Sequence, residues 1–230
     1  MKLLALDTST EACSVALWLD GQLSQLDEVC PQQHSKRILP MIDQLLATAG
    51  IRLQQLDGLV FGRGPGSFTG VRIGVGVAQG LAFAADLPVY GVSTLQAMAQ
   101  TAWRHARQQR VVAAIDARMA EVYLAQYQYD AGSGLMLAQT AEVACKPEQL
   151  PPLVLTDVQL LVGTGAQSYP ALLQNWAHGA PCSADILLPS ASDMLQIAQP
   201  AFIRGDFVAP EQAEPVYVRD EVTWQKLPGR

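Results

Sequence analysis

The fold is decided by the apolar stretch Leu3-Leu4-Ala5-Leu6-Asp7-Thr8-Ser9 near the start of the chain and by its echo at Val112-Ala113-Ala114-Ile115-Asp116-Ala117-Arg118. Each stretch reads as a buried strand that ends in an aspartate beside a small residue. A second strand pattern follows each one, at residues 12–18 and 122–129. The two copies lie about half a chain length apart, so the repeat predicts two related halves.

Strand and helix patterns alternate along the rest of the chain. The turn dipeptide Asp20-Gly21 predicts a hairpin, and Gly50 marks the end of a helix over residues 35–49. Pro40 inside that pattern predicts either a kink or a start near Leu39. Further patterns predict strands at residues 22–29, 59–61, 88–92 and 160–163, and helices at residues 69–84, 94–107, 169–177 and 190–204. This alternation is typical of α/β proteins and not of all-β folds.

The polar, arginine-rich segment at residues 104–110 is the expected domain boundary. We expect an N-terminal domain at residues 1–108 and a reduced C-terminal domain at residues 109–230. The last segment of the chain is expected to pack back on the first domain.

Composition limits the classes of function. The chain has 230 residues, of which 50% are apolar and 16% charged, with a formal net charge of −6. The apolar content supports a sizeable core, and the acidic balance argues against an isolated, non-specific nucleic-acid binder. The N-terminus carries no signal-peptide pattern, and no run of about 18 apolar residues is free of charge. We therefore expect a cytoplasmic protein without a membrane-spanning helix.

The cysteines and histidines show no zinc-type spacing. The cysteines are Cys13, Cys30, Cys145 and Cys182, and the histidines are His34, His105 and His178. The cysteines form no CxxC pair, and no histidine is followed by a second His or Cys three or four residues later. We interpret the cysteines as reduced thiols and the histidines as caps or surface residues, and we expect no metal.

A glycine-rich segment, residues 62–70, lies before a predicted helix, where free backbone N–H groups can receive a phosphate. The segment matches neither a P-loop, which needs a lysine, nor the GxGxxG fingerprint. In the alternative interpretation the glycines let the helix pack closely, because Gly66, Gly70, Gly74 and Ala78 recur every fourth residue. Spacing alone leaves both interpretations open.

Two aspartates and a basic cluster are further candidates for chemistry. Asp7 and Asp116 each end a strand, where a carboxylate could hold a metal–phosphate or act as a base. The alternative is that each caps a turn or is paired with a neighbour. The cluster Arg104, His105, Arg107 and Arg110 could touch an RNA phosphate or an acidic partner, or it could simply form the solvated end of a helix.

One long motif resembles a known family. It is Gly64-Pro65-Gly66-Ser67-Phe68-Thr69-Gly70-Val71-Arg72-Ile73-Gly74, and a shorter one near the end of the chain is Pro215-Val216-Tyr217-Val218-Arg219. Together with the opening strands, these residues resemble the bacterial TsaB (YeaZ) family over essentially the whole chain. The resemblance implies the actin-like ASKHA fold, which is ribonuclease H-like, with two duplicated α/β domains and mixed sheets.

The same resemblance implies a function. TsaB proteins serve the formation of N6-threonylcarbamoyladenosine (t6A) next to the anticodon of tRNAs reading ANN codons. Their paralogue TsaD carries the metal and transfers the threonylcarbamoyl group, TsaE joins the complex, and TsaC supplies threonylcarbamoyl-AMP. At the positions comparable to TsaD's metal-binding HxxxH, this chain has Thr94 and Met98. We therefore expect no metal and no catalysis here, but a scaffold that activates TsaD and meets tRNA only through the complex.

The resemblance also points to two helices, near residues 35–49 and 69–84, as the surface that pairs with TsaD, or with a second copy when TsaD is absent. We expect part of their apolar stripes to be exposed, so that Asp substitutions at Met41 and Ile42 disrupt pairing without unfolding the chain. The alternative is that these stripes are ordinary core. The expected interface residues are His34, Arg37, Ile38, Met41, Ile42, Leu45, Val71, Ile73, Gly74, Val75 and Ala78.

A vestigial or shared site for ATP or ADP is expected at the interface with TsaD. Its candidate residues are Asp7, Thr8, Gly64, Pro65, Gly66, Ser67, Thr69 and Arg72. Two competing functions are an actin-like ATP-binding protein or small-molecule kinase and, with less support, a metallopeptidase. The broken phosphate loops argue against the first, and the lack of a histidine pair argues against the second.

Overall fold

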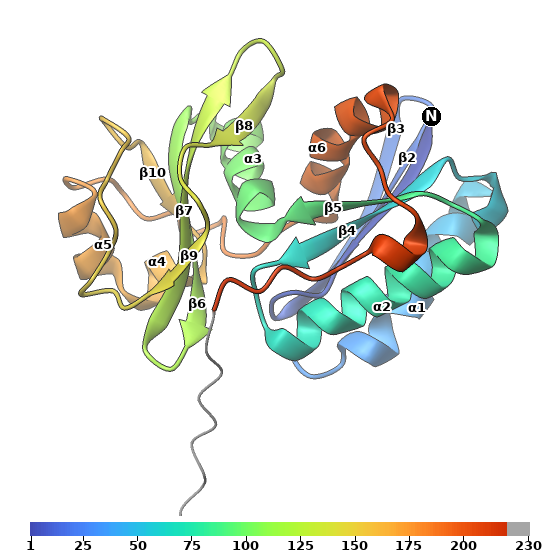
Figure 1. Ribbon diagram of the computed structural model, residues 1–230, viewed down its shortest axis with the longest axis horizontal. Coiled ribbons are helices and arrows are strands. Elements are labelled where there is room, and N and C mark those ends of the chain that lie inside the picture. The colour runs from blue at the N-terminus through green and yellow to red at the C-terminus, as the bar shows by residue number, and fades with distance from the viewer. Residues whose placement is uncertain (220–230) are drawn as a thin grey trace, which may run out of the picture.

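Two five-stranded sheets form the framework of the computed structural model, which describes residues 1–219 (Figure 1). The first sheet has the order β3-β2-β1-β4-β5 and the second the order β10-β6-β7-β8, with β9 also paired to β7. The strands of the first sheet are β1 Lys2–Asp7, β2 Ala12–Leu19, β3 Gln22–Val29, β4 Gly58–Gly64 and β5 Val89–Ser93. Those of the second are β6 Arg110–Arg118, β7 Glu121–Asp130, β8 Leu135–Ala138, β9 Val143–Cys145 and β10 Leu160–Val162.

The two sheets repeat one arrangement, as the echo of the opening stretch predicts. In the first, β1 pairs antiparallel with β2 and parallel with β4. In the second, β6 pairs antiparallel with β7 and parallel with β10. The expected mixed α/β sheets and the duplication are thus confirmed. The second copy is reduced, because no helix is formed between β9 and β10 where α1 lies in the first.

Helices cover both faces of each sheet. They are α1 His34–Ala49, α2 Phe68–Ala85, α3 Thr94–Ala106, α4 Thr164–Ser168, α5 Pro170–Trp176 and α6 Ala191–Arg204, with short 3-10 turns at η1 Leu53–Gln55 and η2 Pro210–Gln212. Helices α1 and α2 pack on the outer face of the first sheet and α6 on its inner face. Helix α3 packs on the second sheet and contacts α6, so these two helices form a central layer (Figure 1).

The chain crosses between its halves twice. The expected boundary at residue 108 separates the strands of the two sheets, but α3 lies before it and packs on the second sheet. Helix α6 lies after it and packs on the first. The segment after α6 then returns along the first sheet, where Val208 bridges to Val89 and the Val216 N–H donates to the Arg63 carbonyl. The boundary itself stays a prediction.

Helix α1 follows its sequence pattern closely. Its buried residues are Ile38, Met41, Ile42, Leu45 and Leu46. Their spacing of three and four places them on one stripe, which lies against the sheet. Gly50 ends the helix in the left-handed conformation that glycine tolerates best. The helix begins at His34, so it runs through Pro40 and does not start near Leu39.

The glycines at the start of α2 serve close packing. A methyl group built at Gly66 would overlap the Ser9 carbonyl oxygen, and one at Gly70 would overlap the Thr8 carbonyl oxygen. At Gly74 it would lie 2.8 Å from the Thr8 hydroxyl. The helix therefore rests directly on the turn between β1 and β2. Of the two interpretations of this segment, close packing is confirmed.

Two glycine substitutions in α2 test this contact. We expect Gly70→Ala to lower the free energy of unfolding by about 1–3 kcal/mol, because the added methyl group meets rigid backbone. The matched control, Gly80→Ala, adds the same group where no atom lies within 4 Å. It should raise the free energy of unfolding by about 0.5–1 kcal/mol through helix propensity. Urea denaturation followed by circular dichroism measures both, and equal effects would contradict the packing role.

Candidate ligand cleft and docking helix

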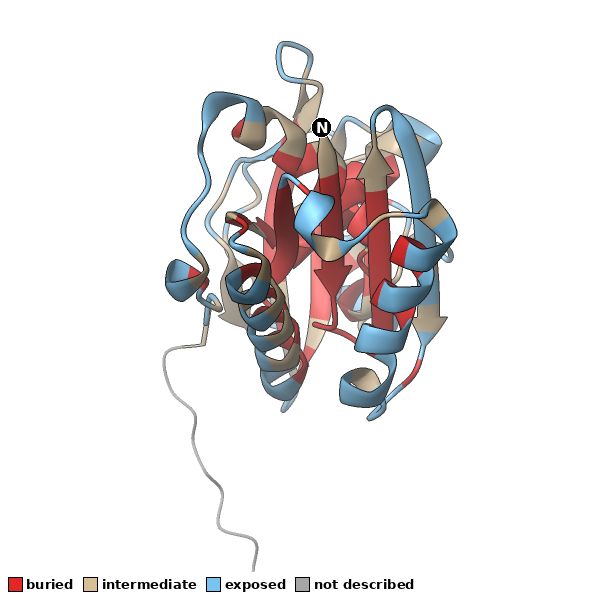
Figure 2. Ribbon diagram, turned by 90° about the vertical axis from the view of Figure 1, so that its right-hand side faces the viewer, coloured by how far each residue is buried: buried red, intermediate tan, exposed pale blue. Residues whose placement is uncertain are grey.

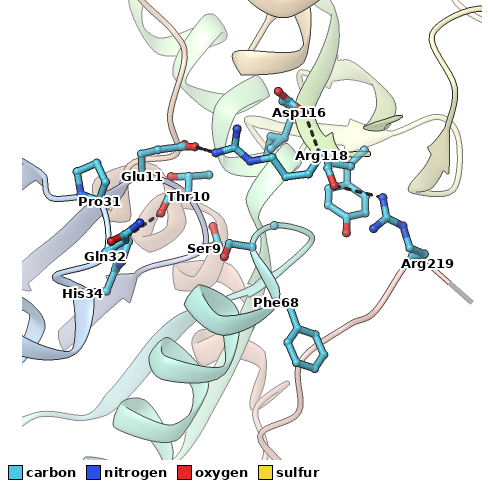
Figure 3. A pocket seen from close by; sticks show the side chains of 15 residues that line it. Ser9, Thr10, Glu11, Pro31, Gln32, His34, Phe68, Asp116, Arg118 and Arg219 are labelled. Carbon is cyan, nitrogen blue, oxygen red and sulfur yellow. Dashed lines mark hydrogen bonds and ion pairs between the residues drawn. The ribbon is translucent and has the colours of Figure 1, made fainter. Parts of the chain in front are cut away.

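A cleft of about 380 Å³ lies where the two halves meet (Figure 3). The turn after β1, the starts of α1 and α2, and the β6–β7 hairpin form its walls. The lining residues are Ser9, Thr10, Glu11, Pro31, Gln32, His34, Gly66, Ser67, Phe68, Ile115, Asp116, Ala117, Arg118, Tyr123 and Arg219. Such a concave site between two α/β halves is a usual place for a small ligand.

Charged groups of both signs face the cleft, and most of them are paired. The Arg118 guanidinium lies 2.9 Å from Glu11 across the two halves. Asp116 accepts the Arg118 backbone N–H at 2.8 Å, so its carboxylate caps a turn, as one interpretation predicts. Arg219 donates to Glu121 and to the Ala117 carbonyl. Its Nε atom is buried and has no hydrogen-bond partner among residues 1–219.

Asp7 lies beneath the cleft and does not line it. The residue is 1% exposed, and its Oδ1 accepts hydrogen bonds from the Ser9 backbone at 3.1 Å and the Ser9 hydroxyl at 2.9 Å. Its Oδ2 has no partner in the described part of the chain and lies against Gly62, where a side chain would not fit. Burial raises the pKa of Asp7 to about 6, although the bonds from Ser9 oppose that rise.

The structure separates the residues that were expected to bind a nucleotide. Gly66 and Ser67 line the cleft. Ser67 also caps α2, accepting from the Gly70 N–H at 3.4 Å. The remaining candidates lie elsewhere: Asp7, Thr8, Gly64 and Pro65 are buried, and Thr69 and Arg72 are exposed on α2.

The glycines at the start of α4, next to β6, are also used for packing. A methyl group at Gly163 would overlap the Ala114 carbonyl oxygen, and one at Gly165 would lie 3.0 Å from the same atom. The Thr164 hydroxyl, between them, accepts the Asp116 backbone N–H at 3.1 Å. Both glycine-rich segments, one in each half, therefore contact the chain's own backbone.

Three arginines of the basic cluster near the end of α3 contact other residues of this chain. Arg104 makes a two-point ion pair with Asp193 in α6, at 2.8 and 2.9 Å, and the Asp193 side chain is fully buried. Arg107 lies over the Trp103 ring, and Arg110 donates to the Asp157 carbonyl. The interpretation of this cluster as a contact for RNA or an acidic partner is wrong for Arg104, which instead joins α3 to α6.

The expected interface residues on α1 and α2 require a correction. Most of them are buried in the core of the single chain: Ile38, Met41, Ile42, Leu45, Val71, Gly74, Val75 and Ala78. Asp substitutions at Met41 and Ile42 would therefore unfold the chain, because these side chains are only 3% and 2% exposed. The periodic stripe marks the face that lies on the sheet, and the face that could meet a partner is the opposite one. Only Arg37, His34 and Ile73 of the expected set keep exposed surface.

The outer face of α2 is apolar as well. It carries Gly76 and Gly80, where small residues expose the backbone, and Phe83, which is 70% exposed. A second hollow of about 310 Å³ lies between this face and η2. In Figure 2 the outer sides of the helices are pale blue around the red strands of the buried sheet. We call the set Ile73, Gly76, Val77, Gly80 and Phe83 the docking face.

By length and mean hydropathy, α2 is the one helix in the described chain that could cross a membrane. An apolar helix that packs on a sheet and also exposes an apolar outer face passes the same test. A third of its residues are buried inside the structure.

The fold places the chain in the actin-like ASKHA class, since two mixed sheets related by an internal repeat enclose the cleft. A family model described as TsaD, tRNA N6-adenosine threonylcarbamoyltransferase, matches residues 26–159. The tRNA threonylcarbamoyladenosine biosynthesis protein TsaB of Escherichia coli is 51% identical over the full length of both chains. The protein of the same name from Haemophilus influenzae is 48% identical, covering all of this chain and 98% of that one.

A crystal structure of YeaZ from Pseudomonas aeruginosa superposes with a TM-score of 0.83 at 45% identity, covering 94% of this chain and 99% of that one. The chain belongs to the TsaB family.

Neutralising Asp7 tests its ionisation. Its pKa is higher in the folded chain, about 6, than its ordinary value of 3.8. The folded state therefore holds its proton to higher pH than the unfolded state. As the pH rises from below 3.8 to above about 6, the contribution of Asp7 to the free energy of unfolding must therefore fall by about 3 kcal/mol.

Urea denaturation at several pH values measures the effect. Relative to the natural chain, Asp7→Asn should gain about that amount of stability between about pH 4 and about pH 7. The control is Asp43→Asn, the same substitution at an exposed position on α1. A stability difference between Asp7→Asn and the natural chain that stays constant with pH would contradict the raised pKa.

Proposed function

We propose that the chain is a non-catalytic scaffold that activates TsaD in the formation of t6A next to the anticodon of tRNAs reading ANN codons. The observation that carries the proposal is the exposed, apolar docking face of α2 on a chain whose glycine-rich segments are occupied by internal packing. TsaE joins the assembly and TsaC supplies its substrate. The tRNA is held through these partners, in the cytoplasm, which suits a chain with a net charge of −6.

The match to the TsaD family model supports TsaD as the direct partner. The matched residues, 26–159, include both α1 and α2. A paralogue with the same fold would present an equivalent helix pair, and two equivalent faces can pack about an approximate twofold axis. A second copy of this chain would offer that face too, so a homodimer forms when TsaD is absent. Small residues at Gly76 and Gly80 allow such helices to approach closely.

A nucleotide shared with the partner is the second part of the proposal. The cleft wall keeps two polar groups without partners among residues 1–219, the Thr10 hydroxyl and the Arg219 Nε. Because the glycine-rich segments are filled by internal backbone contacts, we propose that ATP or ADP binds at the cleft mouth near Gly66 and Ser67 only when TsaD completes the site. ATP is titrated into the chain alone and into its complex with TsaD. A shared site predicts binding only to the complex, whereas an actin-like kinase would bind ATP without a partner.

Reconstitution of tRNA threonylcarbamoylation tests the main proposal. TsaC, TsaD and TsaE are assayed with tRNA, ATP, threonine and bicarbonate, with and without this chain. Product that depends on its presence supports the activator function. Equal product without it would contradict the proposal and reopen the search for a separate activity.

A charge on the docking face tests the surface. Phe83→Asp should weaken TsaD binding by about thirtyfold or more, because burying an unpaired carboxylate in an apolar interface loses at least about 2 kcal/mol. The matched control is Ile203→Asp on α6, which packs on the other face of the first sheet and where this residue is 78% exposed. Binding is measured by calorimetry and folding by thermal denaturation. Normal TsaD binding by Phe83→Asp would show that the docking face is elsewhere.

A further inference from the structure

Three metal-ligating side chains meet at one corner of the first half, beside the cleft. They are Cys13 in β2, Cys30 directly after β3, and His34, the first residue of α1. Their two sulfur atoms and a histidine ring nitrogen all lie within 4.8 Å of one another. Cys13 and Cys30 are buried, and His34 is half-buried. Ligand distances of about 2.0–2.3 Å place the donor atoms of a tetrahedral zinc site about 3.3–3.8 Å apart, so these side chains would close by up to about 1.5 Å around the ion.

The backbone holds these residues in place. Strand pairing sets Cys13 opposite Glu28. Cys30, two residues after Glu28, is therefore the diagonal neighbour of Cys13 on the same face of the sheet. The Cys30 N–H donates to the Glu11 carbonyl at 3.0 Å, and the Gln33 N–H donates to the Cys30 carbonyl at 2.9 Å. The chain then enters α1 at once. The three donors therefore come from rigid elements, as an organised metal site requires.

The ring of His34 also makes a hydrogen bond of the kind that orients metal-binding histidines. Its Nε2 lies 2.7 Å from the Thr10 carbonyl oxygen. A carbonyl can only accept a hydrogen bond, so Nε2 carries the hydrogen and, in the neutral ring, Nδ1 keeps a free lone pair. Metal-binding histidines commonly fix their tautomer through such a bond from the other ring nitrogen.

The donor set at this corner fits a soft dication, because two thiols and an imidazole lie together. A dication would balance two thiolates, and the soft sulfur and imidazole donors select zinc over the oxygen-preferring magnesium or calcium.

An entry path and a further polar group complete the arrangement. His34 and Thr10 both line the cleft, so an ion can reach the corner from solvent. The Thr10 hydroxyl is buried and has no hydrogen-bond partner among residues 1–219. It offers a hydrogen bond at the same corner to a water molecule that fills the fourth position on the metal.

We propose that Cys13, Cys30 and His34 bind one Zn²⁺ ion. Binding replaces the two thiol hydrogens with the metal and releases both protons to solvent. The ion would join β2, the end of β3 and the start of α1 into one unit at the cleft wall. The sequence interpretation of no metal is the expectation that this proposal replaces. Cys30 precedes His34 by four residues, and Cys13 lies in β2, so no zinc-type spacing follows the histidine.

Cobalt substitution tests the site in the full-length chain. After chelation and dialysis, the protein is titrated with Co²⁺ and then with Zn²⁺. We expect one equivalent of Co²⁺, a thiolate-to-cobalt charge-transfer absorption typical of tetrahedral sulfur ligation, and its loss on Zn²⁺ addition. Cys13→Ala and Cys30→Ala should abolish the band, and His34→Ala should weaken Co²⁺ binding by about tenfold or more. The matched controls Cys145→Ala and Cys182→Ala should leave it unchanged.

Alkylation of the natural chain gives a readout that needs no variant to fold. The four thiols are labelled with N-ethylmaleimide with and without Zn²⁺ under conditions that partly open the structure, and each is quantified by peptide mass spectrometry. Zinc should protect Cys13 and Cys30 and leave Cys145 and Cys182 at their metal-free rates. Equal labelling of Cys13 and Cys30 in both conditions, or a cobalt band that persists without either cysteine, would overturn the proposal.

Discussion

The contact between the start of α2 and the turn after β1 is the constraint on which the rest of the structure depends. Glycines at every fourth position bring the helix backbone against the carbonyl oxygens of Thr8 and Ser9. The Thr8 hydroxyl strengthens this contact by donating to the Gly70 carbonyl at 2.7 Å. The same approach buries one stripe of α2 and leaves Phe83, on its opposite face, exposed beside η2. The close packing of α2 on the first half and the surface that it presents to solvent thus have one physical cause.

Ion pairs hold the two halves around the cleft, but they differ in strength. Arg104 and Asp193 form the most consequential pair, because Asp193 is fully buried and would be an uncompensated charge without its partner. Arg63 and Glu142, at 3.1 Å, are also largely shielded. The Arg118–Glu11 pair at the cleft mouth is exposed and contributes little to stability. The halves are therefore fixed at their centre, while the entrance to the cleft is only weakly joined.

The sequence predicts the repeat, the buried strands and most helices, because these depend on local periodicity. It also predicts which residues of α1 form an apolar stripe, but not whether that stripe packs on the chain's own sheet or on a partner. Met41 and Ile42 pack on the sheet, so an interface assigned to them is wrong. Short strands such as β8 and β9 are missed because their few residues carry no clear period. The meeting of Cys13, Cys30 and His34 depends on strand register and helix entry, which spacing along the chain does not encode.

The exchange of α3 and α6 between the halves has a consequence for the order of events during synthesis. The first sheet is complete once β5 has been made, but the helix that covers its inner face follows only after the entire second sheet. Until α6 leaves the ribosome, the apolar inner faces of β1, β2 and β4 stay uncovered, a state that favours association with chaperones or with other nascent chains. The inner face of the first sheet can therefore be covered only after the whole second sheet has been synthesised.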